Sequence, residues 1–333
     1  AATRRHPPPP AATRRHPPPP AATRRHPSRP GRPAPTFPPP MSRAGIVTVV
    51  GRPNAGKATL LNRLVGQKLS ITSPKPQSTR DRIVGIRSEG DVQMVLLDTP
   101  GLLDPAYALQ SAMRATANAA LEDADVIVYL ADAQAGYPPP LEQAAALTRA
   151  PKAPVLVVLN KIDAVPASEL AKVRDRHPEA ILVSALTGDG IPTLIAAVAA
   201  RLPESPFLYP EDDLSTQHLR FFAAELVRET ALEQLSDEVP YSIACEIEEF
   251  REDRTPLYIR AVIHVERDSQ KRILIGAGGA RVKQIGRVAR QKIERLTGAA
   301  VYLDLWVKVL PNWRRDPNAL ARLGYSIPPR EEQ

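Results

Sequence analysis

The chain has 333 residues, of which 43% are hydrophobic and 24% are charged. This composition is ordinary for a globular protein and excludes a wholly disordered chain, and the length allows two domains with separate cores. Cys245 is the single cysteine, which excludes an internal disulfide and favours a reducing compartment. No apolar run reaches the roughly 20 residues of a membrane-spanning helix, so any membrane contact is expected to be peripheral.

The formal net charge of +8 comes from the first forty residues. Residues 1–40 contain eight arginines and no acidic residue, so removing these eight from the 44 basic residues leaves 36, which equals the number of acidic residues. The rest of the chain is therefore formally neutral, and only local clusters of charge can indicate a partner.

Residues 1–40 repeat the unit Ala-Ala-Thr-Arg-Arg-His followed by prolines, and the third copy is degenerate. A segment so rich in proline cannot bury enough surface to offset the entropy of ordering, so we predict a disordered extension. It lacks the apolar stretch of a secretory signal. The simplest interpretation places the start site at Met41, and the alternative is a basic arm that touches RNA.

From residue 41 to 202, short apolar runs rich in β-branched residues alternate with helical stretches. The strand candidates are 46–50, 82–86, 92–97, 126–130, 155–159 and 180–183. This pattern predicts an α/β domain with a mostly parallel sheet covered on both faces. In such sheets ligands bind beyond the carboxyl ends of the strands.

The first strand runs into Gly51-Arg52-Pro53-Asn54-Ala55-Gly56-Lys57-Ala58, and a helical stretch follows. A glycine-rich turn between a strand and a helix lets backbone N–H groups and the positive helix end face one anion, which predicts a phosphate-binding loop. Lys57 would reach the outer phosphates, and the next position usually carries a hydroxyl that binds Mg²⁺. Here that position is Ala58, and Thr59 does not replace it because adjacent helical side chains point about 100° apart. The alternative is a purely structural turn.

The third strand ends in Asp98-Thr99-Pro100-Gly101. An acid at a strand end can hold a metal ion through water, and the glycine lets its N–H approach a terminal phosphate. The polar stretch 76–81 contains Thr79, whose hydroxyl could join the metal shell when a γ-phosphate is bound. A Pro-Gly turn and a plain connecting loop are the alternatives for these two segments.

The fifth strand ends in Asn160-Lys161-Ile162-Asp163. The Asp163 carboxylate could accept hydrogen bonds from N1 and N2 of guanine, a donor pair that adenine lacks. Asn160 would orient the loop, the Lys161 stem would lie along the base, and the N–H groups of Ser184-Ala185-Leu186 would face the guanine O6. Each string alone could be a helix cap or a turn. Their order at separate strand ends predicts binding of a guanine nucleotide.

Prolines at 203, 206 and 210 mark a linker, after which the pattern predicts a helix over 217–235 and strands over 241–250 and 257–265. Gly276-Ala277-Gly278-Gly279 then separates two helical stretches, an arrangement with which KH modules clamp single-stranded RNA. The second stretch has an apolar stripe at 282, 285, 289, 293 and 296, and basic residues at 281, 283, 287, 290, 292 and 295. A solvated amphipathic helix is the alternative to an RNA-binding face.

The nucleotide motifs resemble those of the Era family of bacterial GTPases, which take part in small ribosomal subunit assembly. The resemblance continues through Pro240-Tyr241-Ser242, Val265-Glu266-Arg267 and Leu305-Trp306-Val307-Lys308-Val309, and it covers residues 45–326. It implies a P-loop GTPase domain of α/β class with a mostly parallel sheet over 41–202. A linker over 203–216 and a smaller α+β type II KH domain with a C-terminal tail over 217–333 complete the implied organisation.

The resemblance also implies roles for individual residues. Lys57, Thr79 and Gly101 are expected to act in catalysis, with Thr79 and Asp98 serving Mg²⁺ and Asn54 offering a site for K⁺. Contacts with GTP or GDP are expected from Gly51, Asn54, Ala55, Gly56, Lys57, Ala58, Thr59, Asp98, Gly101, Asn160, Lys161, Asp163, Ser184, Ala185 and Leu186. Contacts with the 3′ end region of small-subunit ribosomal RNA are expected from Gly276, Ala277, Gly278, Gly279, Arg281, Lys283 and Arg287.

Two positions depart from the family pattern. The family has Ser where this chain has Ala58, which weakens the expected Mg²⁺ site, and it usually has a basic residue where this chain has Gly278, which lowers the expected RNA affinity. Leu102 stands where many small GTPases keep a catalytic Gln, a substitution that the family shares.

The preferred interpretation is an enzyme that hydrolyses GTP to GDP and phosphate and assists small-subunit assembly. It is expected in the cytoplasm, with peripheral contact at the cytoplasmic face of the cell membrane. One alternative is a nucleotide-sensing RNA-binding scaffold whose hydrolysis is impaired by Ala58. The other is a membrane-signalling GTPase whose KH-like part docks protein or lipid.

Overall fold

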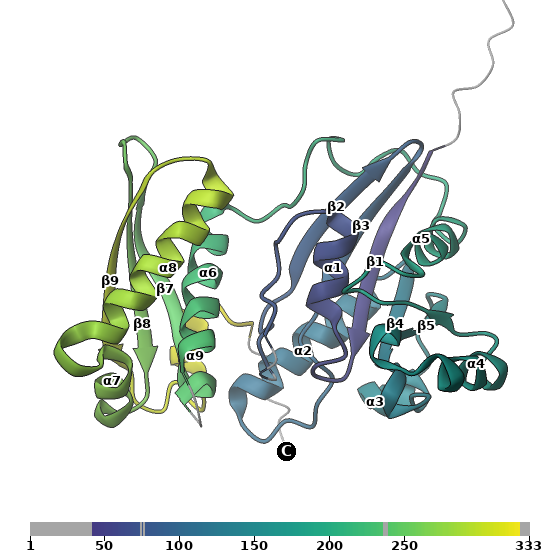
Figure 1. Ribbon diagram of the computed structural model, residues 1–333, viewed down its shortest axis with the longest axis horizontal. Coiled ribbons are helices and arrows are strands. Elements are labelled where there is room, and N and C mark those ends of the chain that lie inside the picture. Colours follow the sequence, from purple (N-terminus) through teal and green to yellow (C-terminus); the bar gives the residue numbers. More distant parts are fainter. Residues whose placement is uncertain (1–41, 74, 76, 236–238, 327–333) are drawn as a thin grey trace, which may run out of the picture. The chain divides into compact units, whose positions relative to one another are not determined.

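Figure 1 shows the computed structural model, which describes residues 42–73, 75, 77–235 and 239–326. The predicted extension at residues 1–40 lies outside the described residues, as do Met41 and Pro76. All described residues belong to one of the two compact units into which the chain divides. They form two sheets, each with its own helices.

The first sheet has six strands in the order β2-β3-β1-β4-β5-β6. Their bounds are β1 Arg43–Gly51, β2 Ile83–Glu89, β3 Val92–Asp98, β4 Val126–Asp132, β5 Val155–Asn160 and β6 Ile181–Leu182. All neighbouring pairs are parallel except β2 with β3, which confirms the prediction of a mostly parallel sheet. β2 is antiparallel because only Gly90 and Asp91 separate it from β3, and so short a connection joins antiparallel strands.

Helices cover both faces of this sheet (Figure 1). They are α1 Lys57–Val65, α2 Ala108–Glu122, α3 Leu141–Ala145, α4 Ala167–Arg176 and α5 Ile191–Ala199. Along β4, Val128 packs with residues of α1 and α5 in one buried cluster, whereas Ile127 and Tyr129 pack with α2 and α3 in another. This alternation follows from the two-residue period of a strand. It buries both faces and leaves the strand ends for polar loops.

The second sheet has three strands, β7 Ala244–Arg251, β8 Leu257–Val265 and β9 Val301–Val309, in that order. β8 and β9 are parallel, so the chain crosses over between them through α7 Asp268–Ile275 and α8 Ala280–Thr297. Together with α6 Leu219–Gln234, these helices bury one apolar cluster against the sheet. A short helix, α9 Pro317–Arg322, follows β9.

The elements of this second half agree only in part with the patterns read from the sequence. The helix predicted over 217–235 and the strand predicted over 257–265 are present as α6 and β8. The strand predicted over 241–250 begins later, at Ala244, because Val239–Ser242 form a 3₁₀ turn. β9 and α9 had no counterpart among the predicted elements.

A buried ion pair on α6 holds the loop that precedes β2. The Arg228 guanidinium donates hydrogen bonds to the Glu225 carboxylate at 2.8 and 2.6 Å. It also donates to the Ser78 carbonyl at 2.5 Å. Two charges taken out of water need such partners, since a buried charge without a partner is strongly destabilising. The loop residue before Thr79 is therefore fixed to the second half of the chain.

Arg80 makes a second link from the same loop. Its guanidinium donates to the Ile243 carbonyl at 2.5 Å and to the Tyr241 carbonyl at 3.3 Å. It also lies over the Trp313 ring, 5.6 Å from the centre, and Trp313 in turn stacks on Tyr325. Stacking and cation–π contacts of a desolvated guanidinium stabilise this arrangement further.

Asp81 lies beside this cluster, and burial together with the Glu225 carboxylate raises the pKa of its carboxyl from 3.8 to about 6. Folded Asp81 thus keeps its proton to higher pH than unfolded Asp81, so the free energy of unfolding falls as the pH rises from about 4 to about 6. We expect Asp81→Asn, which cannot ionise, to raise the free energy of unfolding by about 1–2 kcal/mol near pH 7.5 and to change it little near pH 4. Denaturant unfolding at both pH values measures the difference.

Asp104→Asn is the matched control, because the Asp104 carboxylate is fully exposed and pairs with Arg114 at the surface. This control should leave the free energy of unfolding close to that of the native chain, because ion pairs at the surface contribute little to stability. A gain for Asp81→Asn that is the same at both pH values would contradict the prediction.

Candidate functional site

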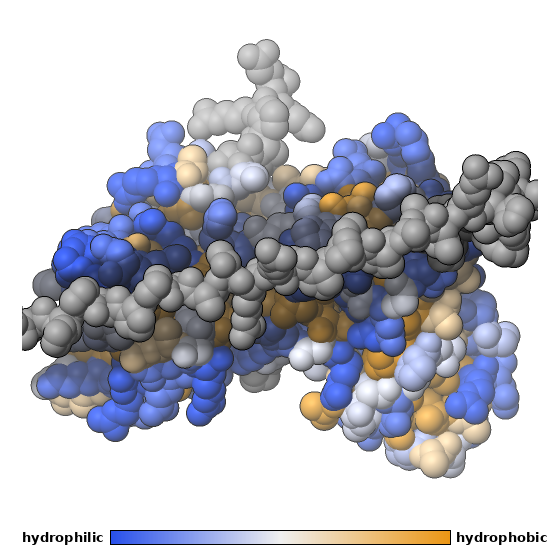
Figure 2. All heavy atoms as spheres, turned by 90° about the horizontal axis from the view of Figure 1, so that it is seen from above, coloured by the Kyte–Doolittle hydropathy of each residue, from blue (hydrophilic) through white to orange (hydrophobic). Residues whose placement is uncertain are grey.

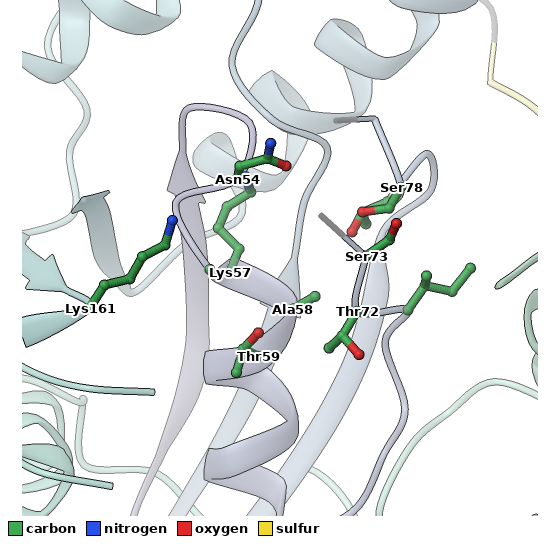
Figure 3. A pocket seen from close by; sticks show the side chains of 11 residues that line it. Asn54, Lys57, Ala58, Thr59, Thr72, Ser73, Ser78 and Lys161 are labelled. Carbon is green, nitrogen blue, oxygen red and sulfur yellow. The ribbon is translucent and has the colours of Figure 1, made fainter. Parts of the chain in front are cut away.

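A cavity of about 460 Å³ opens beyond β1, between the first turn of α1 and the loop that precedes β2 (Figure 3). The structure brings seven of the predicted site residues to its wall: Asn54, Gly56, Lys57, Ala58, Thr59, Thr79 and Lys161. The remaining wall comes from Ile71, Thr72, Ser73 and Ser78. Segments far apart in the sequence therefore meet around one space.

The wall at the start of α1 is suited to an anion. Gly56 has a φ of 97°, in the left-handed region, and a Cβ on it would come within 2.3 Å of the Asn160 amide nitrogen. α1 begins at the next residue, and the first N–H groups of a helix have no partners within the helix. These groups and the helix dipole together favour a bound phosphate.

Lys57 is almost fully buried, with 7% of its surface exposed. Its Nζ donates to the backbone carbonyls of Gly51 and Arg52, each at 3.1 Å. Burial lowers the pKa of this amine from 10.5 to about 8, and the Asp98 carboxylate opposes the shift. A phosphate in the cavity would place a negative charge beside the buried ammonium and so favour its protonated form.

The Asn160 carboxamide, 2% exposed, joins the two ends of the site. Its Nδ2 donates to the Ala55 carbonyl at 2.8 Å, and its Oδ1 accepts a hydrogen bond from the Ala185 N–H at 2.9 Å. The phosphate-binding loop and the loop 184–186 are thereby fixed to each other through one side chain.

The predicted base-binding residues lie together at the ends of β5 and β6. The Ser184 hydroxyl donates to Asp163 Oδ1 at 2.5 Å, so the carboxylate lies beside the loop 184–186. Lys161 donates to Asp132 Oδ2 at 2.8 Å while its stem reaches the cavity wall. Leu186 is exposed. The Asp163 carboxylate and the backbone groups of residues 184–186 are therefore close enough together to contact the edge of one planar ring.

Sequence reasoning missed Arg63, in the last turn of α1. Its Nε donates to the Ala185 carbonyl at 3.1 Å, and its Nη2 donates to the Leu186 carbonyl. Arg63 therefore supports the loop 184–186 from a second point besides Asn160. No signal in a single sequence distinguishes this arginine from one that caps a helix end or faces solvent.

Asp98, at the end of β3, is fully buried behind the cavity. Its Oδ2 accepts hydrogen bonds from the Ser70 hydroxyl at 2.5 Å and from the Thr79 hydroxyl at 3.2 Å. Its Oδ1 is buried and has no hydrogen-bond partner among the residues that the structure describes. Burial raises the pKa of this carboxyl, and Lys57 and the two hydroxyls oppose that shift. The Asp98 Oδ1 atom and the Thr79 hydroxyl are therefore available to a metal ion. Two such oxygens suit Mg²⁺, which binds through few protein oxygens and several waters.

The side chain of Ala58 has no oxygen atom that could bind a metal ion. Figure 3 shows the Ala58 methyl group and the Thr59 side chain on different sides of the first turn of α1. Thr59 lines the cavity wall but points away from Ala58 (Figure 3). The Thr59 hydroxyl therefore does not lie on the side of the helix that the Ala58 methyl group occupies.

Gly101 packs against the phosphate-binding loop. A Cβ at this position would lie 2.9 Å from the Pro53 backbone nitrogen, so only glycine allows this approach. The next residue, Leu102, donates its N–H to the Gly51 carbonyl at 3.0 Å and is buried. The Leu102 side chain lies in an apolar cluster with Val50 and offers no group to activate water.

The predicted RNA-binding loop joins α7 to α8. Gly276 precedes a 3₁₀ turn over Ala277–Gly279, and Gly278 within it has a φ of 56°. The Arg281 guanidinium donates to the Ile273 carbonyl at 2.8 Å, so it supports the end of α7. Lys283 and Arg287 are exposed on α8, and neither forms an ion pair within the part of the chain that the structure describes.

The basic helix α8 is less uniformly available to RNA than its sequence suggested. Lys292 pairs with Glu233 at 2.8 Å and with Glu229 at 2.9 Å. Arg290 pairs with Glu294 at 3.3 Å. In Figure 2, hydrophilic side chains predominate on much of the visible outer surface. Among the described residues, the exposed cations of α8 without an ion pair therefore include Lys283 and Arg287 toward the Gly-x-x-Gly loop and Arg295 in the last turn.

The comparisons with known proteins cover both halves of the chain. Residues 46–161 match the family model described as a 50S ribosome-binding GTPase, and residues 238–314 match the KH domain. The chain is 45% identical over 294 residues to GTPase Era of Ectopseudomonas mendocina, covering 86% of this chain and 98% of that protein. It is 44% identical to GTPase Era of Pseudomonas aeruginosa, covering 86% and 96%.

Two solved structures are similar over the same share of the chain. A crystal structure of Era in complex with MgGDPNP and nucleotides 1506-1542 of 16S ribosomal RNA has 40% identity and a TM-score of 0.80, covering 86% of this chain and all of that one. A crystal structure of a point variant of Aquifex aeolicus Era bound to GDP.AlF4- has 41% identity and a TM-score of 0.79, with the same coverage.

The lowered pKa of Lys57 predicts a pH dependence of phosphate binding. Above about pH 8 the free amine must take up a proton before it can pair with a phosphate, so we expect the association constant for GDP to fall by up to about tenfold per pH unit. Titration calorimetry between about pH 7 and 9 measures this slope. Lys57→Arg is the control, because a guanidinium stays charged throughout this range. Equal slopes in both proteins would contradict the role assigned to Lys57.

Proposed function

The chain belongs to the Era family of GTPases, and we propose that it hydrolyses GTP, binds small-subunit ribosomal RNA and assists assembly of the small ribosomal subunit. One observation carries the proposal: the phosphate-binding loop, Thr79 and Lys161 line one cavity, and Asn160 links that loop to the predicted base-binding loop. This arrangement suits a nucleotide with its phosphates at α1 and its base at the ends of β5 and β6.

Each site residue has a role in this proposal. Lys57 and the N–H groups that open α1 neutralise the phosphates, and Gly101 brings its N–H close to the terminal one. Asp163 and the loop 184–186 select guanine. Asp98 and Thr79 would hold Mg²⁺, which when bound offsets charge on the phosphate oxygens. The proposal also includes a K⁺ ion beside Asn54 that would stabilise the charge developing on the phosphates. Leu102 stands where other GTPases have a glutamine that positions water, so this chain lacks that side chain's contribution.

The proposal that the second half of the chain binds RNA rests on its match to the KH domain and on the loop 276–279. A relative with 40% identity is solved with nucleotides 1506-1542 of 16S ribosomal RNA, so the proposed ligand is the corresponding region of the small-subunit RNA. Gly276 to Gly279 would approach the RNA backbone, and Arg281, Lys283 and Arg287 would supply positive charge beside it. In this proposal the GTPase domain spans 41–202, a linker 203–216, and the KH domain 217–333.

The location of the protein also belongs to the proposal. Within the part of the chain that the structure describes, no helix is long and apolar enough to cross a membrane. The proposal places the protein in the cytoplasm, where its ribosomal RNA ligand is found. Peripheral contact with the membrane stays a prediction from the family resemblance.

Contacts between the cavity wall and α6 support control of RNA binding by the nucleotide. The buried Glu229 carboxylate accepts hydrogen bonds from Lys68 at 2.8 Å and from the Thr72 N–H at 3.2 Å, both in the segment that leads into the cavity wall. The same carboxylate accepts from Lys292 of α8 at 2.9 Å. A change in the loop around a γ-phosphate would therefore alter the partners of the RNA-binding helix.

Ala58 favours one alternative, a nucleotide-sensing RNA-binding scaffold with little hydrolysis. The two functions differ in phosphate release when GTP, Mg²⁺ and K⁺ are present. Titration with GDP and ADP tests guanine selectivity, on which both functions depend.

We expect Ala58→Ser to hydrolyse GTP at least about tenfold faster than the native chain at limiting Mg²⁺, because a hydroxyl at this position adds an oxygen ligand. Phosphate release over a range of Mg²⁺ concentrations measures the effect. Ala58→Cys is the matched control, since a thiol has similar size but is a poor ligand for Mg²⁺. Equal turnover of the native chain and Ala58→Ser at limiting Mg²⁺ would refute the prediction, and no turnover in either would favour the scaffold.

We expect Gly278→Lys to bind a single-stranded RNA of the 3′ end sequence more tightly than Gly278→Gln. Both side chains meet the same strained backbone, so the comparison isolates the charge. One added phosphate contact should steepen the dependence of log affinity on log salt by about 0.7. Fluorescence anisotropy over a salt series measures both quantities, and identical slopes for the two variants would contradict a loop that contacts phosphate.

A further inference from the structure

We propose that Ser70 supplies, from outside the phosphate-binding loop, the hydroxyl that organises the Mg²⁺ site of this chain in the absence of one at position 58. The inference rests on the proposed function, because it concerns the metal ion of the same nucleotide site. It assigns to Ser70 a positioning role that acts through Asp98.

The first observation is the contact between Ser70 and Asp98. Ser70 is 1% exposed, and its hydroxyl donates to Asp98 Oδ2 at 2.5 Å, the shorter of the two hydroxyl contacts to this carboxylate. A hydrogen bond to an ionised acceptor is about twice as strong as one between neutral groups. It fixes the carboxylate plane, and within the described part of the chain Oδ1 is the oxygen without a hydrogen-bond partner.

The second observation explains why Ser70 is held in place. Asn62 of α1 accepts hydrogen bonds from the Leu69 and Ser70 N–H groups, each at 2.8 Å, and donates to the Ser70 carbonyl at 2.8 Å. Three bonds from one carboxamide fix residues 69 and 70 against α1. Asn62 lies four residues after Ala58, so the two side chains share one helix face.

On this face of α1, Ala58 in the first turn has no hydroxyl, and Asn62 in the next turn holds Ser70 in place. Thr79, the other hydroxyl on Asp98, belongs to the loop that Arg228 and Arg80 tie to the second half of the chain. Ser70 itself is tied to α1 through Asn62, while its neighbours Lys68 and Thr72 are bound by Glu229 of α6. The Ser70 contact thus joins Asp98 to the phosphate-binding helix by a route that does not depend on Arg228 or Arg80.

The test compares the dissociation constants for a fluorescent GDP in EDTA and in Mg²⁺, and their ratio is the magnesium gain. For Ser70→Ala we expect the magnesium gain to fall by about tenfold, while affinity in EDTA stays within about twofold of the native chain. Ser70→Cys, which keeps the volume but is a weak donor, should show the same loss. This second variant answers the question if Ser70→Ala does not fold.

Ser242→Ala is the matched control. The Ser242 hydroxyl is also buried, it donates to the Val239 carbonyl at 2.8 Å, and Ser242 is not one of the residues that line the cavity. Its loss should leave the magnesium gain unchanged. In an Ala58→Ser background, Ser70→Ala should lower the magnesium gain by less than about threefold, because a second hydroxyl then serves the metal site.

Several results would overturn the inference. They are an unchanged magnesium gain in Ser70→Ala, an equal loss of affinity in EDTA and in Mg²⁺, and an equal loss in the native and Ala58→Ser backgrounds. In each case GDP still binds, so the proposed function stands. Absence of GDP binding in both solutions for the native chain would contradict the proposed function and this inference together.

Discussion

The buried carboxamide of Asn160 is the contact on which the nucleotide site depends. It uses its donor for the phosphate-binding loop and its acceptor for the loop 184–186, so these two loops are held at one separation. Gly56 has to lack a side chain because the amide nitrogen occupies the place of a Cβ. Breaking either hydrogen bond would leave a buried polar group without a partner, which costs about 1–3 kcal/mol and loosens two loops at once.

A second constraint runs from the cavity to the RNA-binding half. The loop between α1 and β2 lines the cavity, and its residues are bound by Glu229 and Arg228 of α6. The Glu229 carboxylate and the Arg228 guanidinium are buried, so both groups would need new hydrogen-bond partners if the loop moved away from them. A loop held by such specific partners can move only by exchanging them for others, as segments that switch with a bound nucleotide do.

The large-scale organisation could be predicted from the sequence because it follows from strong, local patterns. Apolar strands and the polar strings after them placed the phosphate-binding loop, Asp98 and Asn160 at one sheet edge. β9 escaped prediction because its outer face exposes Tyr302 and Trp306, which obscures the alternation of buried and exposed residues. Lys292 was counted among the basic residues of this helix, yet it pairs with acids of α6, a neighbour that no sequence spacing specifies.

The contacts that complete the site escaped prediction for the same reason. Arg63 and Ser70 act on residues far along the chain, and the hydroxyl of a single serine carries no periodic signal. Asn62 was the available hint, since it is a polar residue between the buried Leu61 and Leu64 of α1. The two departures from the family pattern, Ala58 and Gly278, were visible at once because the surrounding motifs fix what those positions should contain.

The chain has two tryptophans, and the fold places them in opposite environments. Trp313 is fully buried under Arg80 and stacks on Tyr325, whereas Trp306 is 54% exposed on β9. Their indole emission is therefore distinguishable by colour and by access to a dissolved quencher. Because Arg80 adjoins Thr79, the shielded indole gives this protein an intrinsic optical reporter of the loop beside the nucleotide, with no dye attached.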